Sequence, residues 1–126
     1  MLYFVFGPSN TGKTSHLISK YFELPEGSTI IISNEELVES GDRMLGTDCM
    51  CKDLIYHLTP ETQRVLVDNA HTMSRANIAV LKEASRTREV ICYGRLKNEN
   101  GKLIKSSALL LEQADLIVDR NLLEFL

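Results

Sequence analysis

Residues 7–14 read Gly-Pro-Ser-Asn-Thr-Gly-Lys-Thr, which has the G-x-x-x-x-G-K-[ST] spacing of a loop that holds phosphate. Gly7 and Gly12 permit backbone angles that other residues resist, so the N–H groups of the loop can surround an anion. Lys13 can reach the outer phosphates of a triphosphate, and the Thr14 hydroxyl can ligate Mg²⁺. An apolar run precedes the motif and a helical pattern follows it, as this chemistry requires. The sequence therefore predicts ATP and Mg²⁺ as ligands, with nucleotide-binding residues Gly7, Ser9, Asn10, Thr11, Gly12, Lys13 and Thr14.

A second apolar run, Val65-Leu66-Val67, ends in Asp68 and has the Walker B pattern, in which the carboxylate holds Mg²⁺ directly or through water. Buried strands also end in Asp for a plainer reason, because Asp favours turns. Asn69 follows, and its amide can orient a water molecule but cannot accept its proton. We therefore expect Thr14 and Asp68 to ligate the metal, and a base for hydrolysis to lie elsewhere.

Glu35 is the predicted base, because Ser33-Asn34-Glu35-Glu36 ends the β-branched run 29–33 and would lie at the carboxyl edge of a parallel sheet. In a plainer interpretation, Asn34 caps a helix and both glutamates favour its positive end. The two interpretations are compatible, since a capped helix would hold Glu35 in place.

Arg95 follows the apolar run 90–93 and is expected to face the terminal phosphate, where a guanidinium can stabilise charge. The plainer interpretation is a surface arginine that opens a hairpin. His71 can hydrogen-bond the attacking water or the phosphate, although such a histidine more often flanks the following helix. Lys13, Glu35 and Arg95 are the predicted catalytic residues.

The elements that must position these residues alternate between strands and helices, which predicts an α/β fold with a parallel sheet. Strands are expected at 2–6, 29–33, 64–68, 90–93 and 116–118. Helices are expected at 14–22, 35–45, 51–58, 73–84 and 106–114, and Asn100-Gly101 predicts a hairpin turn. The prediction is a P-loop NTPase fold, with a mainly parallel five-stranded sheet flanked by helices in a single nucleotide-binding domain over 1–126.

Composition limits the partners. The formal net charge of −3 argues against broad nucleic-acid binding. The basic segment 95–105 lacks an aromatic residue that could stack on bases, so we expect a solvated hairpin there rather than a nucleic-acid contact. Three cysteines without a framework, no charged leader and no apolar run near the roughly 18 residues of a membrane span favour a cytoplasmic protein. A protein partner or a homo-oligomer stays open.

Several segments resemble the RecA-like ATPase core found in replicative helicases, the repair ATPase RadA and the clock ATPase KaiC. They are Ser33-Asn34-Glu35-Glu36, Arg43-Met44-Leu45, Cys92-Tyr93-Gly94-Arg95 and the stretch 111–120. The resemblance implies ATP hydrolysis with Glu35 as base. It also implies that the strand at 90–93 lies between the strands at 2–6 and 64–68.

The sequence also resembles type II thymidine kinases, whose phosphate loop begins Gly-Pro and whose later segment is similar to Cys92-Tyr93-Gly94 and Ala114-Asp115. Asp68-Asn69-Ala70-His71 stands where that family has Asp-Glu-Ala-Gln, so its base is replaced by Asn69. The family's zinc lobe and thymidine-covering lasso would follow residue 120, which implies a shortened, divergent relative. The predicted function is a Mg²⁺-dependent ATPase of RecA-like type; the alternatives are a deoxynucleoside kinase-like protein and a nucleotide-gated binding module with little catalysis.

Overall fold

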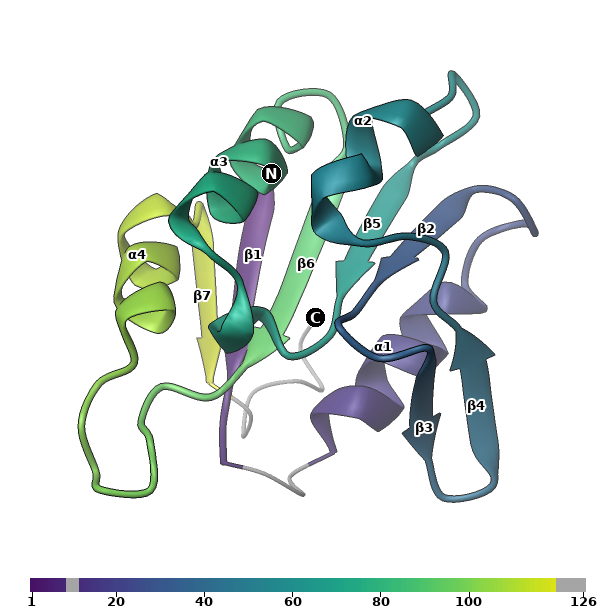
Figure 1. Cartoon of the computed structure of the whole chain (residues 1–126). Coiled ribbons are helices and arrows are strands. Elements are labelled where there is room, and N and C mark those ends of the chain that lie inside the picture. Colours follow the sequence, from purple (N-terminus) through teal and green to yellow (C-terminus); the bar gives the residue numbers. More distant parts are fainter. Residues whose placement is uncertain (9–11, 120–126) are drawn as a thin grey trace.

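Figure 1 shows the computed structural model of the chain, which describes residues 1–8 and 12–119. At its centre lies a sheet of five strands in the order β2-β5-β6-β1-β7. The strands are β1 (Leu2–Phe6), β2 (Thr29–Ile32), β5 (Arg64–Val67), β6 (Glu89–Gly94) and β7 (Leu116–Asp119). All neighbouring pairs are parallel, so the carboxyl ends of the strands meet at one edge, the lower edge in Figure 1. The predicted five-stranded parallel sheet is confirmed, as is the place of β6 between β1 and β5.

Helices cover both faces of this sheet. They are α1 (Lys13–Tyr21), α2 (Leu54–His57), α3 (Arg75–Ala84) and α4 (Lys105–Gln113), with 3₁₀ turns η1 (Cys51–Asp53) and η2 (Ala70–Thr72). Four of the five predicted helices are thus confirmed, with shifted ends. Within the described part of the chain, no helix is long and apolar enough to cross a membrane.

Alternate strand residues point into two separate cores. Leu2 and Phe4 of β1 pack with side chains of α2, α3 and α4, whereas Val5 packs with Leu17 and Ile18 of α1. The same alternation recurs in the neighbouring strands, because successive side chains of a strand point to opposite faces. Every residue of β2 and of β5 is buried, as expected for strands that are covered on both faces.

The predicted helix over 35–45 is wrong, because this segment forms a β-hairpin of β3 (Leu37–Ser40) and β4 (Arg43–Gly46). Gly41 opens the two-residue turn with a φ of 61°, a left-handed conformation that favours glycine. Val38 is buried against α1, whereas Leu37 and Met44 are exposed. The apolar spacing that indicated a helix therefore does not form one buried stripe, and the hairpin covers the α1 side of the sheet.

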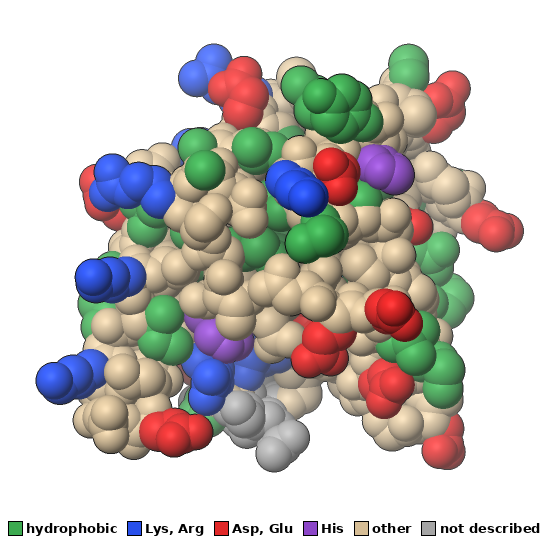
Figure 2. All heavy atoms as spheres, viewed as in Figure 1, with side chains coloured by type: hydrophobic (Ala, Val, Ile, Leu, Met, Phe, Trp, Pro, Cys, Tyr) green, Lys and Arg blue, Asp and Glu red, His purple; other side chains and the backbone are tan. Residues whose placement is uncertain are grey.

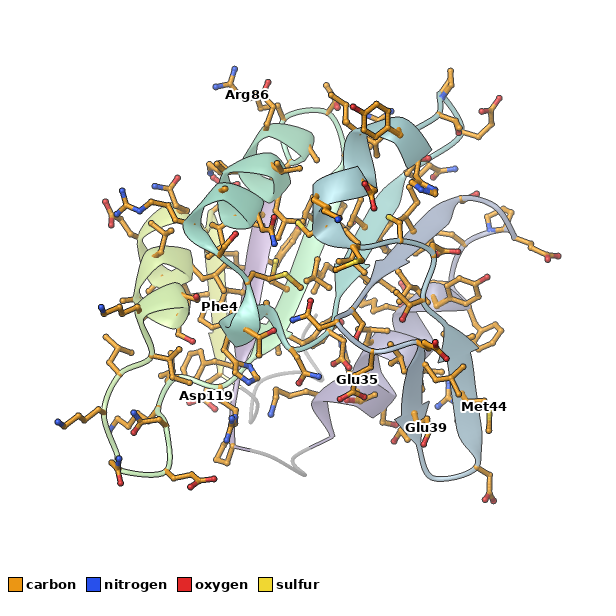
Figure 3. All side chains as sticks on the ribbon, in the orientation of Figure 1. Phe4, Glu35, Glu39, Met44, Arg86 and Asp119 are labelled. Atoms are coloured by element: carbon orange, nitrogen blue, oxygen red, sulfur yellow. The ribbon has the colours of Figure 1, made fainter. Side chains whose placement is uncertain are left out.

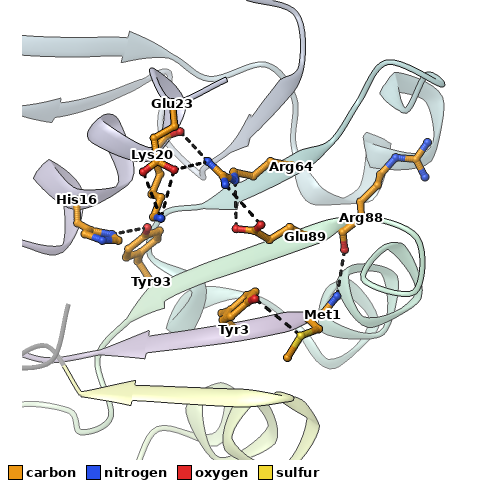
Figure 4. A network of polar contacts seen from close by, with 9 residues as sticks. All are labelled: Met1, Tyr3, His16, Lys20, Glu23, Arg64, Arg88, Glu89 and Tyr93. Carbon is orange, nitrogen blue, oxygen red and sulfur yellow. Dashed lines mark hydrogen bonds and ion pairs between the residues drawn. The ribbon is translucent and has the colours of Figure 1, made fainter. Parts of the chain in front are cut away.

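Arg64 joins α1 to the sheet through a polar network centred on its own buried guanidinium (Figure 4). Its guanidinium lies 3.2 Å from carboxylate oxygens of both Glu23 and Glu89, and it donates to the Lys20 carbonyl at 3.0 Å. On the same side, the His16 ring and the buried Tyr93 hydroxyl form a hydrogen bond of 2.8 Å. These contacts fix α1 against β5 and β6.

Candidate functional site

The loop at 7–14 connects the carboxyl end of β1 to α1, and the structure explains why glycine occupies positions 7 and 12. Gly7 is buried, and its N–H donates to the Gly94 carbonyl at the end of β6 across 3.2 Å. Gly12 precedes α1 with a φ of 85°, which side chains rarely adopt. The predicted residues Ser9, Asn10 and Thr11 lie outside the described residues.

Lys13 and Thr14 begin α1 and face inward. The Lys13 ammonium donates to the Gly7 carbonyl at 2.7 Å and also to the Pro8 carbonyl, so it lies over these two residues. The Thr14 hydroxyl donates to Oδ1 of Asp68 across 3.5 Å. The first turn of α1 and the end of β5 therefore meet, which brings a cation, a hydroxyl and a carboxylate together.

A cavity of about 500 Å³ opens at this meeting point. The described residues that line it are Gly12, Lys13, Thr14, Ser15, Glu39, Ser40, Gly41, Asp68, Asn69, His71 and Arg95. A second hollow of about 550 Å³ shares Thr14, Glu39, Asp68 and Asn69 with it and adds Glu35, Glu36 and Leu37. In Figure 2, basic side chains and a histidine gather beside acidic side chains at the lower edge of the molecule, over the carboxyl ends of the strands.

Asp68 is the buried carboxyl of this cavity, with 8% of its surface exposed. Burial raises the pKa of Asp68, and the nearby charge of Glu35 adds to this rise. A backbone hydrogen bond from Asn69, the Thr14 hydroxyl and the Lys13 charge act in the opposite direction without cancelling it. An ionised Asp68 is therefore costly in the protein alone and would be stabilised by a cation beside it.

Asn69 turns the chain sharply after Asp68. Among the residues that the structure describes, it alone of the non-glycine residues has a positive φ, with φ 51° and ψ 45°. Asn tolerates this left-handed conformation better than most residues. The Asn69 carbonyl accepts from the Thr72 N–H at 3.0 Å and from the Thr72 hydroxyl at 2.7 Å. This turn begins η2 and directs His71 toward the cavity.

Glu35 lies on an irregular segment between β2 and β3, so it does not begin a helix, and Asn34 is not a helix cap. The Glu35 N–H donates to the Ser33 hydroxyl at 3.1 Å, and the Thr47 hydroxyl donates to the Glu35 carbonyl at 2.6 Å. Asn34 instead donates from its amide to the Thr72 hydroxyl at 2.6 Å. The Glu35 side chain is exposed and lines the second hollow with Thr14 and Asp68, next to the start of α1 in Figure 3.

Arg95 and His71 face each other across the end of β6. The Arg95 backbone N–H donates to His71 Nδ1 at 3.2 Å, and Arg95 Nε lies 3.4 Å from His71 Nε2. Burial lowers the pKa of His71, and the charges of Arg95 and Lys13 lower it further. The ring is therefore a neutral hydrogen-bond acceptor around neutral pH.

Most of the predicted site is brought together. Gly12, Lys13, Thr14, Asp68 and Arg95 line the first cavity, Glu35 lines the adjoining hollow, and Gly7 lies at the start of the loop.

Glu39 lines both spaces, and sequence reasoning missed it because that segment was predicted to be a helix. The signal that could have found it is Gly41-Asp42 between two short apolar pairs, which is a hairpin pattern.

Neither a scan against models of protein families nor a search of curated proteins finds a match for this sequence. The functional interpretation accordingly depends on the residues of the cavity and their geometry.

Proposed function

We propose that this chain is a P-loop ATPase of RecA-like type that binds ATP with Mg²⁺ in the cavity between the 7–14 loop and the ends of β5 and β6. The observation that carries the proposal is the convergence of Lys13, Thr14 and Asp68 on one cavity at the carboxyl edge of a parallel sheet. Ligands of open α/β sheets bind at this edge. A backbone loop, a lysine and a helix N-terminus are the groups that hold phosphates there.

The donor set fits Mg²⁺. This ion takes hard oxygen ligands and is commonly held by one or two carboxylates together with substrate phosphates and water. Thr14 offers a hydroxyl and Asp68 a buried carboxylate, 3.5 Å apart. The raised pKa of Asp68, caused first by burial, is consistent with a carboxylate whose charge a cation would balance. The bound ion would supply charge compensation for the outer phosphates.

Glu35 would then serve as the base. Its carboxylate lines a hollow that also contains Thr14 and Asp68, so a water molecule there has an acceptor for its proton. In the proposed step, water oxygen bonds to the terminal phosphorus, the bond from that phosphorus to the bridging oxygen breaks, and the water proton passes to Glu35. ADP and inorganic phosphate leave. Lys13 and Arg95 would stabilise the charge on the phosphate oxygens.

The test measures ATP binding and Mg²⁺-dependent phosphate release by the purified chain and by single variants. Lys13→Ala is expected to abolish ATP binding, because it removes the ammonium group that would neutralise the outer phosphates. Glu35→Gln is expected to keep binding and to lose at least about tenfold in turnover, as removal of a general base does. Glu26→Gln is the matched control, because this glutamate is exposed in a turn outside the cavity.

Two outcomes would overturn the proposal in different ways. Wild-type turnover in Glu35→Gln would remove Glu35 from the mechanism and leave nucleotide binding intact. Failure of the wild-type chain to bind ATP with Mg²⁺ would remove the function as a whole.

Phosphoryl transfer to a nucleoside is the second candidate, and a further hollow beside Arg95 favours it. This space of about 450 Å³ is lined by Phe6, Gly7, Pro8, Arg95, Leu96, Lys97, Asn98 and Asp119. An aromatic ring with amide and carboxylate groups suits a polar ring compound, and Arg95 borders both spaces. Transfer of label from the terminal phosphate of ATP to a deoxynucleoside panel tests it, and no transfer to any member excludes it.

A further inference from the structure

Glu35 lies on a segment whose backbone is held by side chains rather than by a strand or a helix. Residues 33–36 follow β2 without regular secondary structure, and the Glu35 side chain is exposed. The Thr47 hydroxyl donates to the Glu35 carbonyl at 2.6 Å, which ties the segment to the end of β4. A second tie runs from the Asn34 amide to the Thr72 hydroxyl of η2, also at 2.6 Å. The place of the Glu35 carboxylate at the cavity therefore depends on these ties.

The Thr72 hydroxyl takes part in two hydrogen bonds with fixed roles. It lies 2.7 Å from the Asn69 carbonyl, and because a carbonyl cannot donate, the hydroxyl hydrogen points there. The hydroxyl oxygen can then only accept from Asn34, so the NH₂ group of this amide faces it. One hydroxyl thus links Asn34, the residue before Glu35, to Asn69, the residue after Asp68.

The turn that carries Thr72 is a firm anchor for this bridge. Its neighbour Met73 is buried, and the Thr72 backbone N–H donates to the Asn69 carbonyl at 3.0 Å. A Cβ atom on Gly94 would come within 3.0 Å of the His71 backbone nitrogen, so η2 packs directly against the end of β6. We therefore expect η2 to stay in place when only the Thr72 hydroxyl is removed.

The hydroxyl bridge lies outside the proposed site itself. Neither Asn34 nor Thr72 is among the described residues that line the two adjoining spaces at the carboxyl edge of the sheet. Glu35, Asp68 and Asn69, which the bridge connects, do line them. The bridge is therefore expected to affect a bound nucleotide only through these three residues.

We propose that Thr72 is a positioning residue that, through Asn34, holds the Glu35 segment against the turn that follows Asp68. The inference rests on the proposed function and adds how the general base is aligned with the metal end of the site. A general base must lie within hydrogen-bond reach of the water whose proton it accepts, and a displacement of about 1 Å can slow a reaction by up to about a hundredfold. Loss of the bridge should therefore slow turnover and leave nucleotide binding nearly unchanged.

The experiment measures the turnover number for ATP with Mg²⁺ and the dissociation constant of a non-hydrolysable ATP analogue. Thr72→Val removes the hydroxyl at nearly constant volume and is expected to lower turnover about fivefold, the effect of one ordinary hydrogen bond. The dissociation constant should change by less than about twofold, because the bridge makes no contact with the nucleotide. Thr72→Ser keeps the hydroxyl and should retain at least about half of the wild-type turnover.

Further variants separate positioning of the base from a general structural role. Asn34→Ala breaks the bridge at its other end and should lower turnover as Thr72→Val does, and the double variant should lose no more than either single one. In a Glu35→Gln background, Thr72→Val should have no additional effect, because the group that the bridge positions is absent. Thr87→Val is the matched control, since the exposed Thr87 hydroxyl also accepts a hydrogen bond, from Arg88 at 2.9 Å, in the turn between α3 and β6.

Thermal melting by circular dichroism shows whether each variant is folded, and Asn34→Ala carries the test if Thr72→Val is not. Wild-type turnover in the folded variant would overturn this inference alone. A loss of equal size in the Glu35→Gln background would do the same, because Thr72 would then act independently of the base. A wild-type chain that neither binds nor hydrolyses ATP with Mg²⁺ would overturn the proposed function and this inference with it.

Discussion

The Thr14 hydroxyl lies 3.5 Å from Oδ1 of Asp68, although 54 positions of sequence separate the two residues. The contact joins the first turn of α1 to the end of β5, and β6 lies between β5 and the β1 strand that precedes the loop. It places a hydroxyl and a buried carboxyl within range of one small cation. This hydrogen bond does not fully stabilise the ionised form of Asp68, because burial raises the pKa of Asp68 in spite of it.

Asp68→Asn is therefore expected to raise the melting temperature of the ligand-free protein at neutral pH by a few degrees. A carboxyl whose pKa is higher in the folded state than in the unfolded state stabilises the fold while it is protonated. That stability is lost as the pH rises through the folded pKa. The advantage of the variant should therefore shrink as the pH falls toward about 4, the ordinary range of a carboxyl.

Thermal denaturation followed by circular dichroism at the two pH values measures this difference, with Asp42→Asn as the exposed control. The same substitution should remove the Mg²⁺ dependence of nucleotide affinity, so stability and binding would change in opposite directions. A lower melting temperature for Asp68→Asn at neutral pH would show that its hydrogen bonds outweigh its burial.

Glu39→Gln tests the carboxylate that the hairpin adds to the cavity. Glu39 and Asp68 both border the space proposed for phosphates, and two negative charges there repel a third. The variant is expected to bind ATP about threefold more tightly when Mg²⁺ is absent, with the gain fading as salt rises, because Glu39 is exposed and screened. Binding isotherms at low and high ionic strength measure it. A large loss of turnover instead would assign to Glu39 the proton transfer that we propose for Glu35.

The sheet was predictable because each strand contains a short apolar run that differs sharply from its polar flanks. All residues of β2 and β5 are buried, and the composition of such short apolar runs is enough to predict a strand. The Asn100-Gly101 turn was predictable for a different reason, because Asn-Gly favours the positive φ of a hairpin turn. In the structure, Gly101 adopts a φ of 76°, and Lys97 bridges to Leu103 as in a hairpin. Parallel order then brings the strand ends, and with them Asp68 and Arg95, to one edge.

The hairpin was not predictable from the spacing of apolar residues. Two half-buried strands joined by a two-residue turn can have the same apolar spacing along the sequence as an amphipathic helix. Leu37, Val38, Met44 and Leu45 fit both patterns. The Gly41-Asp42 turn favours the hairpin, and packing against α1 decides between the two. The close approach of His71 to Gly94 was equally hidden. It depends on a tertiary contact between η2 and β6, which local sequence does not encode.

Substitution of Gly41 by alanine distinguishes the hairpin from a helix by the sign of the change in the free energy of unfolding. Alanine in an exposed helix is more stable than glycine by about 1 kcal/mol, so a helix over 35–45 would gain from the change. In the hairpin, Gly41 has a φ of 61°, and alanine there is expected to lower the free energy of unfolding by about 1 kcal/mol.

Gly46→Ala is the matched control, because neither glycine has an atom within 4 Å of an added Cβ and Gly46 lacks the positive φ. Urea denaturation of both variants gives the comparison. An increase in stability for Gly41→Ala would contradict the hairpin turn.

Comparing Arg64→Ala with Arg86→Ala tests whether ion pairs of a buried arginine contribute more to stability than those of an exposed arginine. Arg64 contacts Glu23, Glu89 and the Lys20 carbonyl with only 10% of its side chain exposed, whereas Arg86 pairs with Glu83 at 3.2 Å with 74% exposed. Removing Arg64 takes a donor away from Glu89, from Glu23 and from the Lys20 carbonyl, so the free energy of unfolding should fall by about 2 kcal/mol. Glu23 keeps its ion pair with Lys20, and the carbonyl keeps the Glu23 N–H, which limits the loss. Arg86→Ala should change it by less than about 0.5 kcal/mol.

The pH dependence of this difference supplies a second check. Burial acts to raise the pKa of Glu23, but hydrogen bonds and charges from Lys20 and Arg64 hold it below its ordinary value. A carboxyl with a lowered folded pKa stabilises the fold above its unfolded pKa, and this stability is lost as the pH falls through the folded value. The difference between wild type and Arg64→Ala should accordingly narrow in acid, in urea titrations from pH 7 downward. Equal losses for Arg64→Ala and Arg86→Ala at neutral pH would show that the Arg64 network does not anchor α1 to the sheet.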